Sequence, residues 1–278
     1  MKSNGTTFYL ISDGTIKMDG GGVFGQVPRL KWQEMAAPDR QNRIRLGLNC
    51  LLIRNGKHCI LVDTGVGNKE PRGIKDTYGL GNSRLLRELR ARDISPKDIT
   101  DVVLTHLHFD HSGGSTRLDR AGTPVPTFPN ATYYVQEASW EEANQPGERA
   151  AYTYHPDDFL PLKRTGQLQL LQGDTEFDFG VRVKVTDAHT EGHQMVLLNH
   201  GGEKLAFMGD LIPTPHHLQL TCIAAADKTP ESTLELKREF LLQAEREGLL
   251  LLFSHGFESR AGYVEYRDGR WGFRRIDF

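Results

Sequence analysis

The 278-residue sequence has few cysteines, little net charge and no long hydrophobic run. Three cysteines, Cys50, Cys59 and Cys222, are too few and odd in number for a disulfide framework, so we expect buried thiols. A formal net charge of −2 gives no basic face by composition, which offers nucleic acid little support as a partner. No run approaches membrane-spanning length, and the polar N-terminus has no signal-peptide core. We therefore expect a soluble, cytoplasmic protein, and its composition leaves a homo-oligomer open.

Linkers, internal repeats and low-complexity tracts are also missing from the sequence. Its 38% of hydrophobic residues can supply a substantial core. Two stretches that contain glycine and proline, 19–28 and 145–161, also hold aromatic residues, so we interpret them as long functional loops. We expect a single domain over residues 1–278.

Strand-like runs alternate with helical segments through both halves of the chain. Strands are expected at 8–12, 48–53, 58–62, 101–104, 132–135, 168–171, 181–186, 195–199, 205–208 and 249–253. Helices are expected from Asn82 or Ser83, from Ser95, over 136–144, and from Thr229 to Gly248. Asn55-Gly56 predicts a hairpin and Gly201-Gly202 a turn. Periodicity alone predicts a mixed α/β domain.

One short segment is dense in metal-ligand side chains. Residues 105–114 read Thr-His-Leu-His-Phe-Asp-His-Ser-Gly-Gly and contain His106, His108, Asp110 and His111. The first three are each two residues apart and can point the same way, whereas His111 must point elsewhere. The spacing therefore predicts two adjacent metals, one bound by His106 and His108 and the other by Asp110 and His111. Nitrogen and oxygen donors of this kind suit zinc first.

Three further ligand-type residues follow apolar, strand-like runs downstream: His193 in Thr-Glu-Gly-His, Asp210 in Phe-Met-Gly-Asp, and His255 in Phe-Ser-His-Gly. With this order and the HxHxDH motif, the chain resembles the metallo-β-lactamase superfamily of hydrolases over nearly its whole length. The resemblance implies a four-layer αββα sandwich. It also implies one metal bound by His106, His108 and His193, a second bound by Asp110, His111 and His255, and Asp210 as the bridge between them.

The implied site would hold two zinc ions and perform hydrolysis. Two ions about 3.5–4 Å apart can share a water, lower its pKa from about 16 toward 7, and polarise a carbonyl or phosphoryl oxygen. Asp110 would orient the resulting hydroxide and pass a proton to the leaving group. His108 stands where the similar di-iron electron-transfer proteins have Glu, which favours hydrolysis over redox chemistry. A ligand-binding protein with little turnover stays open, and a pocket blocked above an intact metal pair would be its sign.

The substrate class is narrowed by further resemblances. The segments around His106–His111 and His193 resemble quorum-quenching lactonases, but those place a tyrosine three residues after the bridging aspartate, where this chain has Pro213. The run from Asp19 to Gly25, with Trp32, resembles a broader lactonase and organophosphate-hydrolase-like branch. We therefore expect a small-molecule ester or lactone as substrate. Phosphotriester hydrolysis is the alternative, followed by thioester or β-lactam hydrolysis.

Several residues have two interpretations at this stage. Gly20–Gly25 is either a surface turn or a lid that carries Val23 and Phe24 over the metals. Phe109, His216 and His217 are candidate substrate contacts with Phe24, although His216 and His217 could equally be structural. His189 competes with His193 as a ligand, and the Gly-His-Gln match favours His193. One aromatic segment either forms the wall of an apolar pocket or contributes only to packing of the core: Tyr152, Tyr154, His155 and Phe159.

Overall fold

The computed structural model describes residues 2–3, 6–69, 73–200 and 202–277, and these form two large sheets. The first sheet consists, in spatial order, of β1 (Lys2–Ser3), β2 (Thr6–Asp19), β3 (Arg43–Asn55), β4 (His58–Val62), β5 (Asp101–Val103), β8 (Thr132–Gln136) and β9 (Leu168–Leu171). The second consists of β10 (Thr175–Glu176), β11 (Val181–Val185), β12 (Gln194–His200), β13 (Glu203–Phe207), β14 (Leu250–Leu252), β15 (Ala261–Arg267) and β16 (Arg270–Ile276). A separate small ribbon pairs β6 (Thr116–Leu118) with β7 (Pro124–Pro126).

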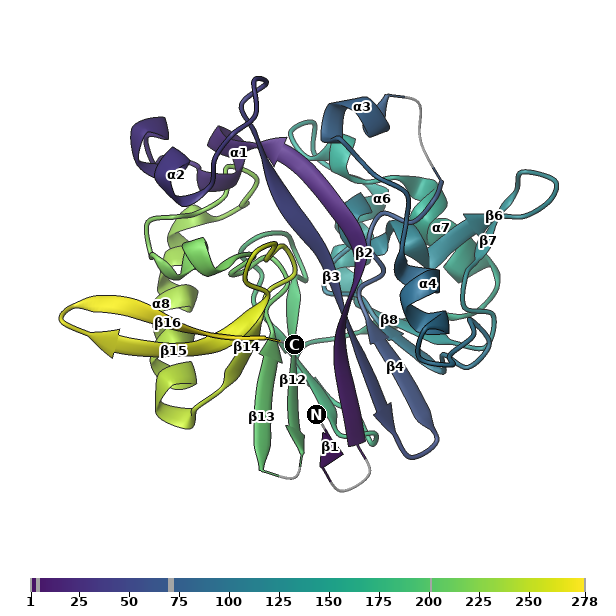
Figure 1. Ribbon diagram of the computed structural model, residues 1–278. Coiled ribbons are helices and arrows are strands. Elements are labelled where there is room, and N and C mark those ends of the chain that lie inside the picture. Colours follow the sequence, from purple (N-terminus) through teal and green to yellow (C-terminus); the bar gives the residue numbers. More distant parts are fainter. Residues whose placement is uncertain (1, 4–5, 70–72, 201, 278) are drawn as a thin grey trace.

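Helices lie outside the two sheets and at one end of them (Figure 1). The α-helices are α1 (Gly20–Phe24), α2 (Arg29–Met35), α3 (Ile74–Tyr78), α4 (Leu85–Arg90), α5 (Phe109–Ser112), α6 (Glu137–Asn144), α7 (Pro156–Arg164) and α8 (Pro230–Glu247). Three short 3₁₀ segments are η1 (Gly113–Ser115), η2 (Ala151–Thr153) and η3 (Pro215–Leu218).

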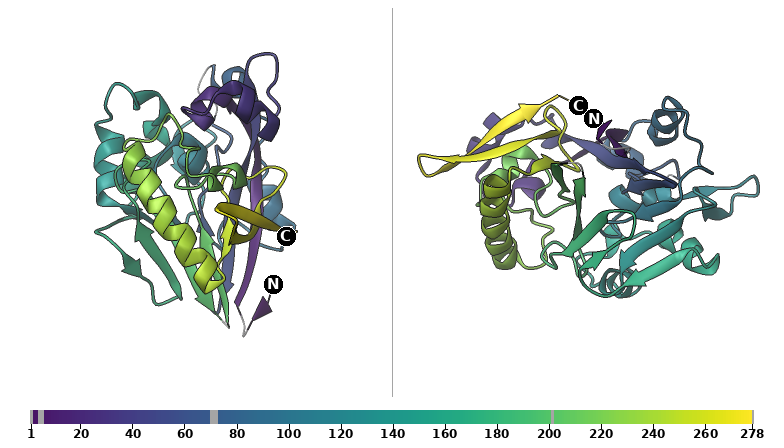
Figure 2. Two further views of the ribbon diagram at one scale, coloured as in Figure 1. Left: turned by 90° about the vertical axis from the view of Figure 1, so that its left-hand side faces the viewer. Right: turned by 90° about the horizontal axis from the view of Figure 1, so that it is seen from below.

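The buried side chains divide into layers because neighbouring residues of a strand point to opposite faces of its sheet. In β3, Leu51 faces a core shared with Phe207 and Leu252 of the second sheet, whereas Leu52 faces a core shared with the helices. Residues of α4, α6 and α7 cover that outer face, and α8 covers the outer face of the second sheet. The layers are seen edge-on in Figure 2. The expected four-layer αββα sandwich is confirmed.

Local predictions succeeded where turn and cap signals were strong. The hairpin at Asn55-Gly56 is present, with Asn55 paired to His58. The C-terminal helix starts at Pro230 and ends before Gly248, whose φ of 65° is a left-handed conformation that suits glycine. Gly201 of the predicted Gly201-Gly202 turn lies outside the described residues. All three cysteines are buried and free, as expected.

Other local predictions were wrong. Residues 96–98 form a turn rather than the start of a helix, because Asp98 accepts hydrogen bonds from the backbone and hydroxyl of Ser95 and closes the turn. The two stretches interpreted as loops contain α1 and the first part of α7. In α7, Pro156 stands in the first turn, where a missing N–H costs nothing.

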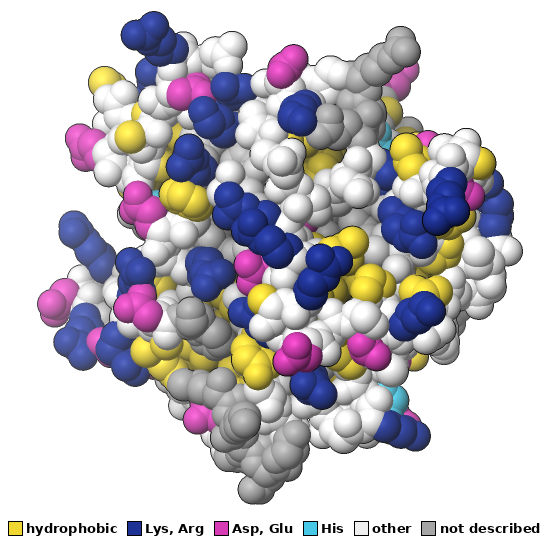
Figure 3. Space-filling model, turned by 45° about the vertical axis from the view of Figure 1, so that its right-hand side comes forward, with side chains coloured by type: hydrophobic (Ala, Val, Ile, Leu, Met, Phe, Trp, Pro, Cys, Tyr) yellow, Lys and Arg dark blue, Asp and Glu magenta, His cyan; other side chains and the backbone are white. Residues whose placement is uncertain are grey.

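No helix in the described part of the chain is long and apolar enough to cross a membrane. On the face drawn in Figure 3, lysine and arginine side chains lie apart, with acidic and uncharged side chains between them.

The strand directions decide where the site is built. β4 runs parallel to β5, and β13 runs parallel to β14. The carboxyl ends of each pair therefore lie at one edge of their sheet, and the 3.2 Å contact between His111 and His255 shows that the two edges meet. The loops that follow them carry Asp63, the 105–114 motif, Asp210 and His255.

Candidate metal centre

The HxHxDH motif begins three residues beyond the end of β5 and continues into α5. His106 is fully buried; its Nδ1 lies 3.1 Å from the Thr105 hydroxyl, and its Nε2 is buried without a partner among the described residues. A buried imidazole nitrogen without a hydrogen bond is costly, so a missing partner is implied at this point.

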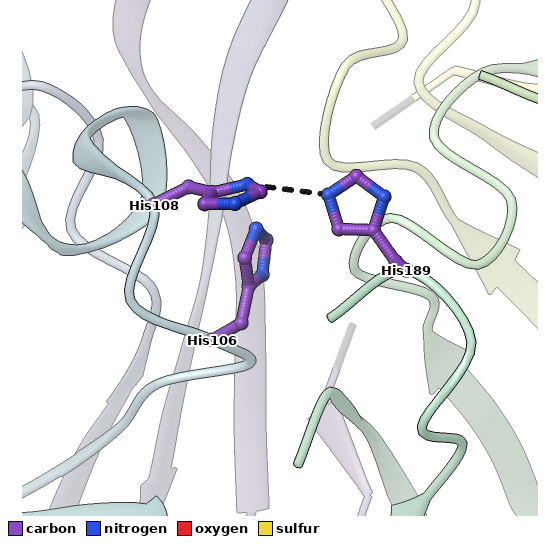
Figure 4. A group of neighbouring side chains, drawn as sticks. All are labelled: His106, His108 and His189. Atoms are coloured by element: carbon purple, nitrogen blue, oxygen red, sulfur yellow. Dashed lines mark hydrogen bonds between the residues drawn. The ribbon is translucent and has the colours of Figure 1, made fainter. Parts of the chain in front are cut away.

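A first site is formed by His106, His108 and His189, whose ligand atoms all lie within 4.8 Å of one another. Figure 4 shows the three rings converging from two different loops. Nδ1 of His108 lies 3.2 Å from Nε2 of His189, and the His106 and His108 ring centroids are 4.5 Å apart. These three imidazoles can bind one metal ion.

His193, which the resemblance assigned to this site, has both ring nitrogens engaged in hydrogen bonds to other groups. Its Nε2 accepts a hydrogen bond from the Asp210 backbone N–H at 2.8 Å, and its Nδ1 lies 2.6 Å from the Thr186 hydroxyl. A ring that accepts at Nε2 and donates from Nδ1 has no lone pair left for a metal. We therefore propose His189 in place of His193 as the ligand. In this proposal His193 supports the backbone of Asp210 rather than binding metal.

Gly209 is packed closely against the ring of His193. Its φ is 51°, and a Cβ placed there would lie 2.5 Å from Nε2 of His193. Only glycine fits both the left-handed conformation and the space. The Gly209-Asp210 step is therefore held in one position.

A second site is formed by Asp110, His111 and His255. Nε2 of His111 and Nε2 of His255 lie 3.2 Å apart, and Oδ2 of Asp110 lies 3.4 Å from the His255 nitrogen. On the other side of its ring, His255 has Nδ1 2.8 Å from the carbonyl of Gly47, so Nδ1 carries the proton and Nε2 faces the site. The structure thus brings these three predicted ligands together.

Asp210 lies between the two sites. Its Oδ1 is 3.3 Å from Nε2 of His111 and 3.4 Å from Nε2 of His255, while its Oδ2 is 3.5 Å from Nε2 of His189. One oxygen therefore faces each site. This placement agrees with the predicted bridging role.

Two buried carboxylates, neither of them predicted from the sequence, lie behind the ligands. Asp63, in a left-handed conformation with φ 56°, lies 2.7 Å from Nδ1 of His111 and accepts from the backbone and hydroxyl of Thr105. Asp227 lies 2.7 Å from Nδ1 of His189. Asp63 was detectable as an acidic residue directly after a buried strand, whereas Asp227 is in a loop without a recognisable pattern.

Charges in the site favour a bound cation. Burial lowers the pKa of His106 well below its usual value. Burial also acts to lower the pKa of His111, but Asp210, Asp110 and Asp63 raise it well above the usual value. Burial opposes ionisation of Asp210, yet His111 and His255 hold its pKa well below its usual value. The carboxylates therefore stabilise positive charge between them, as they would that of a metal ion.

The donor set fits a transition metal on three counts. The imidazole nitrogens and carboxylate oxygens suit zinc, His106 offers an unpartnered nitrogen, and carboxylates or carbonyls hold the far side of His111, His189 and His255. The described residues thus form a candidate metal-binding centre.

The centre forms the floor of a cavity of about 520 Å³. His108, Asp110, His189, Asp210 and His255 all line it. Its largely apolar wall is formed by Met18, Val23, Leu46, Phe109, Ala150, Pro213, Ala224, Ala225 and Ala226. Charged residues, among them Arg149 and Lys228, also line it.

The predicted substrate contacts divide between this cavity and the core. Phe109 lines the cavity; Phe24, His216 and His217 are not among the described residues that do so. Phe24 is buried and stacked between Trp32 and His217, with ring centroids 5.6 Å and 5.5 Å away. Of the aromatic segment, Tyr152 lines the cavity, and the other three residues are not among its described lining.

Helix α1 is a fixed wall of the cavity in this structure. His217 donates from Nε2 to the carbonyl of Val23 at 3.0 Å, and its Nδ1 lies 2.8 Å from the Thr214 hydroxyl. The carbonyl of Gly22 accepts from the backbone N–H of Ala225 at 2.8 Å. The segment 20–25, for which a lid was one interpretation, is therefore held by hydrogen bonds on two sides. Gly22 and Val23 of α1 line the cavity.

The chain is similar in sequence and in fold to several known proteins. An N-acyl homoserine lactonase from a Bacillus species is 29% identical over 164 residues, which cover 54% of this chain and 57% of the lactonase. The alignment thus spans little more than half of that relative. A probable metal-dependent hydrolase from Staphylococcus aureus superimposes with a TM-score of 0.89 and 28% identity over 100% of this chain and 99% of its own. The dizinc quorum-quenching lactonase AidC shares the fold, with a TM-score of 0.81 and 21% identity over 100% of this chain and 97% of its own.

The family model of the metallo-beta-lactamase superfamily matches residues 44–255, a segment that runs from β3 to His255 and contains every proposed ligand. With the four-layer fold and the ligand clusters, this match shows that the chain belongs to the metallo-beta-lactamase superfamily.

Proposed function

We propose that this protein hydrolyses esters or lactones with the help of two zinc ions. The observation that carries the proposal is the pair of ligand clusters with Asp210 between them, set at the floor of a cavity. The proposed first site uses His106, His108 and His189, and the second uses Asp110, His111 and His255. The similarity to homoserine lactonases supports a lactone or a related ester as substrate.

The cavity suits an acyl substrate with an apolar tail. About 520 Å³ is within the range of small-molecule sites, and its apolar wall can remove an acyl chain from water. Asp110 and Asp210 line this cavity, which also argues against a binding protein whose pocket is blocked above the ligands. The acyl carbon would lie at the floor, beside the ligand clusters.

The residues of this chain would hold and move protons around the reacting carbonyl. Bound zinc ions would supply a water of low pKa as nucleophile and would polarise the carbonyl oxygen. Asp110, which lines the cavity, would orient the attacking water with its carboxylate and then pass a proton to the leaving oxygen. Phe109 and Leu46 would exclude bulk water from the acyl side.

Phosphotriester hydrolysis is the second candidate, and Pro213 favours it. Pro213 lines the cavity three residues after Asp210 and has no side-chain donor for a lactone carbonyl. A phosphotriester bound mainly through its contact with metal would depend less on a side-chain hydrogen-bond donor at this position.

A substrate panel tests the proposal. The value of kcat/KM should be measured for the zinc-loaded full chain on lactones, aryl esters, phosphotriesters, thioesters and β-lactams. The proposal expects the highest values with lactones or esters. Higher values with phosphotriesters would select the second candidate, and zinc binding without turnover on any substrate would contradict both.

A further inference from the structure

His189 is held from behind by a buried carboxylate. Nδ1 of His189 lies 2.7 Å from Oδ1 of Asp227, and the two side chains are 4% and 2% exposed. A carboxylate at this distance is an acceptor, so Nδ1 carries the proton and the lone pair of the ring is on Nε2. Nε2 is the atom that faces His108 and Asp210.

Asp227 is itself fixed in place. Its second oxygen, Oδ2, accepts a hydrogen bond from the hydroxyl of Thr233 in the first turns of α8 at 2.9 Å. The next residue, Lys228, donates its backbone N–H toward the carbonyls of Ala188 and His189, each at 3.1 Å. The carboxylate and the ligand therefore belong to one closely bonded unit.

The same segment also forms part of the cavity wall. Ala224, Ala225 and Ala226 line the cavity directly before Asp227. The Arg149 guanidinium donates to the carbonyl of Asp227 at 3.3 Å and to that of Ala225. Residues 224–228 thus connect the wall that would contact a substrate with the carboxylate that holds a ligand.

We propose that Asp227 is the positioning residue of the first metal site: by accepting the Nδ1 proton of His189, it sets the ring so that Nε2 binds metal. This inference rests on the proposed function, because it assumes a metal at that site. The second site has a corresponding arrangement, with Asp63 behind His111. Partners of this kind behind a ligand typically change metal affinity by about 10–100-fold.

The chain contains a matched pair at the other end of β5 from the HxHxDH motif. Nδ1 of His58 lies 2.8 Å from Oδ2 of Asp101, and that oxygen accepts from the Thr100 hydroxyl at 2.6 Å. This pair has the same chemistry as His189, Asp227 and Thr233. Asp101 begins β5, at the opposite end from the motif, so Asp101→Asn is a control for the loss of a buried carboxylate without loss of a ligand partner.

The experiment compares metal binding in the full chain. Metal-free wild type, Asp227→Asn, Asp227→Ala and Asp101→Asn are titrated with zinc against a chromophoric chelator, and the visible spectrum is recorded after cobalt substitution. Asparagine can still accept the Nδ1 proton but has no charge, whereas alanine cannot accept it. We expect one of the two zinc affinities to fall by about 10-fold for Asn and about 100-fold for Ala. We also expect an altered cobalt spectrum for both variants and wild-type metal binding for Asp101→Asn.

Wild-type zinc affinities in Asp227→Asn and Asp227→Ala would overturn the inference, as would an equal loss in Asp101→Asn. If the Asp227 variants do not fold, the same zinc titration of Thr233→Val tests the inference. This variant keeps the carboxylate but frees Oδ2, and it should weaken one zinc site several-fold; unchanged affinity would overturn the inference. Lactone and ester hydrolysis by the wild type is measured in parallel. Two bound zinc ions without turnover would refute the proposed function and leave the Asp227 comparison intact.

Discussion

Two matched substitutions, His189→Gln and His193→Gln, can test whether His189 rather than His193 is the metal ligand. Glutamine is a poor zinc ligand, so His189→Gln removes a donor from the first site, which then keeps His106, His108 and Asp210. Loss of a residue that only hydrogen-bonds to a metal ligand already lowers metal affinity by about 10–100-fold. We therefore expect His189→Gln to weaken one zinc ion by more than about 100-fold and to lower kcat/KM to a similar extent.

His193→Gln should behave differently because its contacts are structural. A glutamine carbonyl can still accept from the Asp210 N–H, while the contact between Nδ1 and the Thr186 hydroxyl, 2.6 Å in the native protein, is lost. One buried hydrogen bond is worth about 1 kcal/mol, which corresponds to a fall in Tm of about 2–4 °C for a chain of this size. Both zinc ions should remain bound.

The assay is elemental analysis after dialysis at a fixed low concentration of free zinc, with Tm measured on the same samples. Wild type and His193→Gln should retain about two zinc ions per chain, and His189→Gln should retain about one. The reverse result, with a zinc ion lost from His193→Gln and two kept by His189→Gln, would refute the ligand assignment made from the hydrogen bonds.

Three further predictions concern the bridge, the wall and the substrate. Asp210→Ala should reduce zinc content and activity more than loss of any other ligand, because its two oxygens face both sites; elemental analysis showing two tightly bound zinc ions would contradict this. Burial, assisted by Lys237, lowers the pKa of His217 from 6.5 to about 3, so the unfolded chain binds a proton that the folded chain does not, and stability should fall as the pH drops from 6.5 toward 3. At pH 4.5 the loss from this group is about 2–3 kcal/mol, and urea unfolding at pH 7 and 4.5 should show a smaller loss for His217→Phe than for wild type. Pro213→Tyr should raise kcat/KM for acyl homoserine lactones but not for phosphotriesters, because Pro213 lines the cavity; equal effects on both substrates would show that no donor is missing there.

Much of the fold was predictable because its signals are local. The Asn55-Gly56 turn determines the register of a hairpin, and the Thr229-Pro230 start and Gly248 stop define a helix, without reference to the rest of the chain. The β15 and β16 hairpin was missed. Its strands are half exposed and rich in arginine, so their hydrophobic pattern is weak.

The candidate site was predictable where several ligands share one short segment, and less so where single residues converge. The 105–114 motif contains four ligand types in close spacing, which no structural role readily explains. His189 and His193 differ only in what lies behind them in the folded protein, namely Asp227 for one and the Asp210 backbone for the other. Such contacts join residues far apart in sequence and leave no local pattern.

The measurement that tests the central claim most directly is lactone and ester hydrolysis by the metal-free protein as zinc is added in known equivalents. The account predicts little turnover without zinc, with activity that rises as zinc binds and reaches a plateau at about two equivalents per chain. A plateau at one equivalent, undiminished in His111→Ala or His255→Ala, would contradict the two-metal site. Full activity in the metal-free protein would contradict the metal-dependent mechanism altogether.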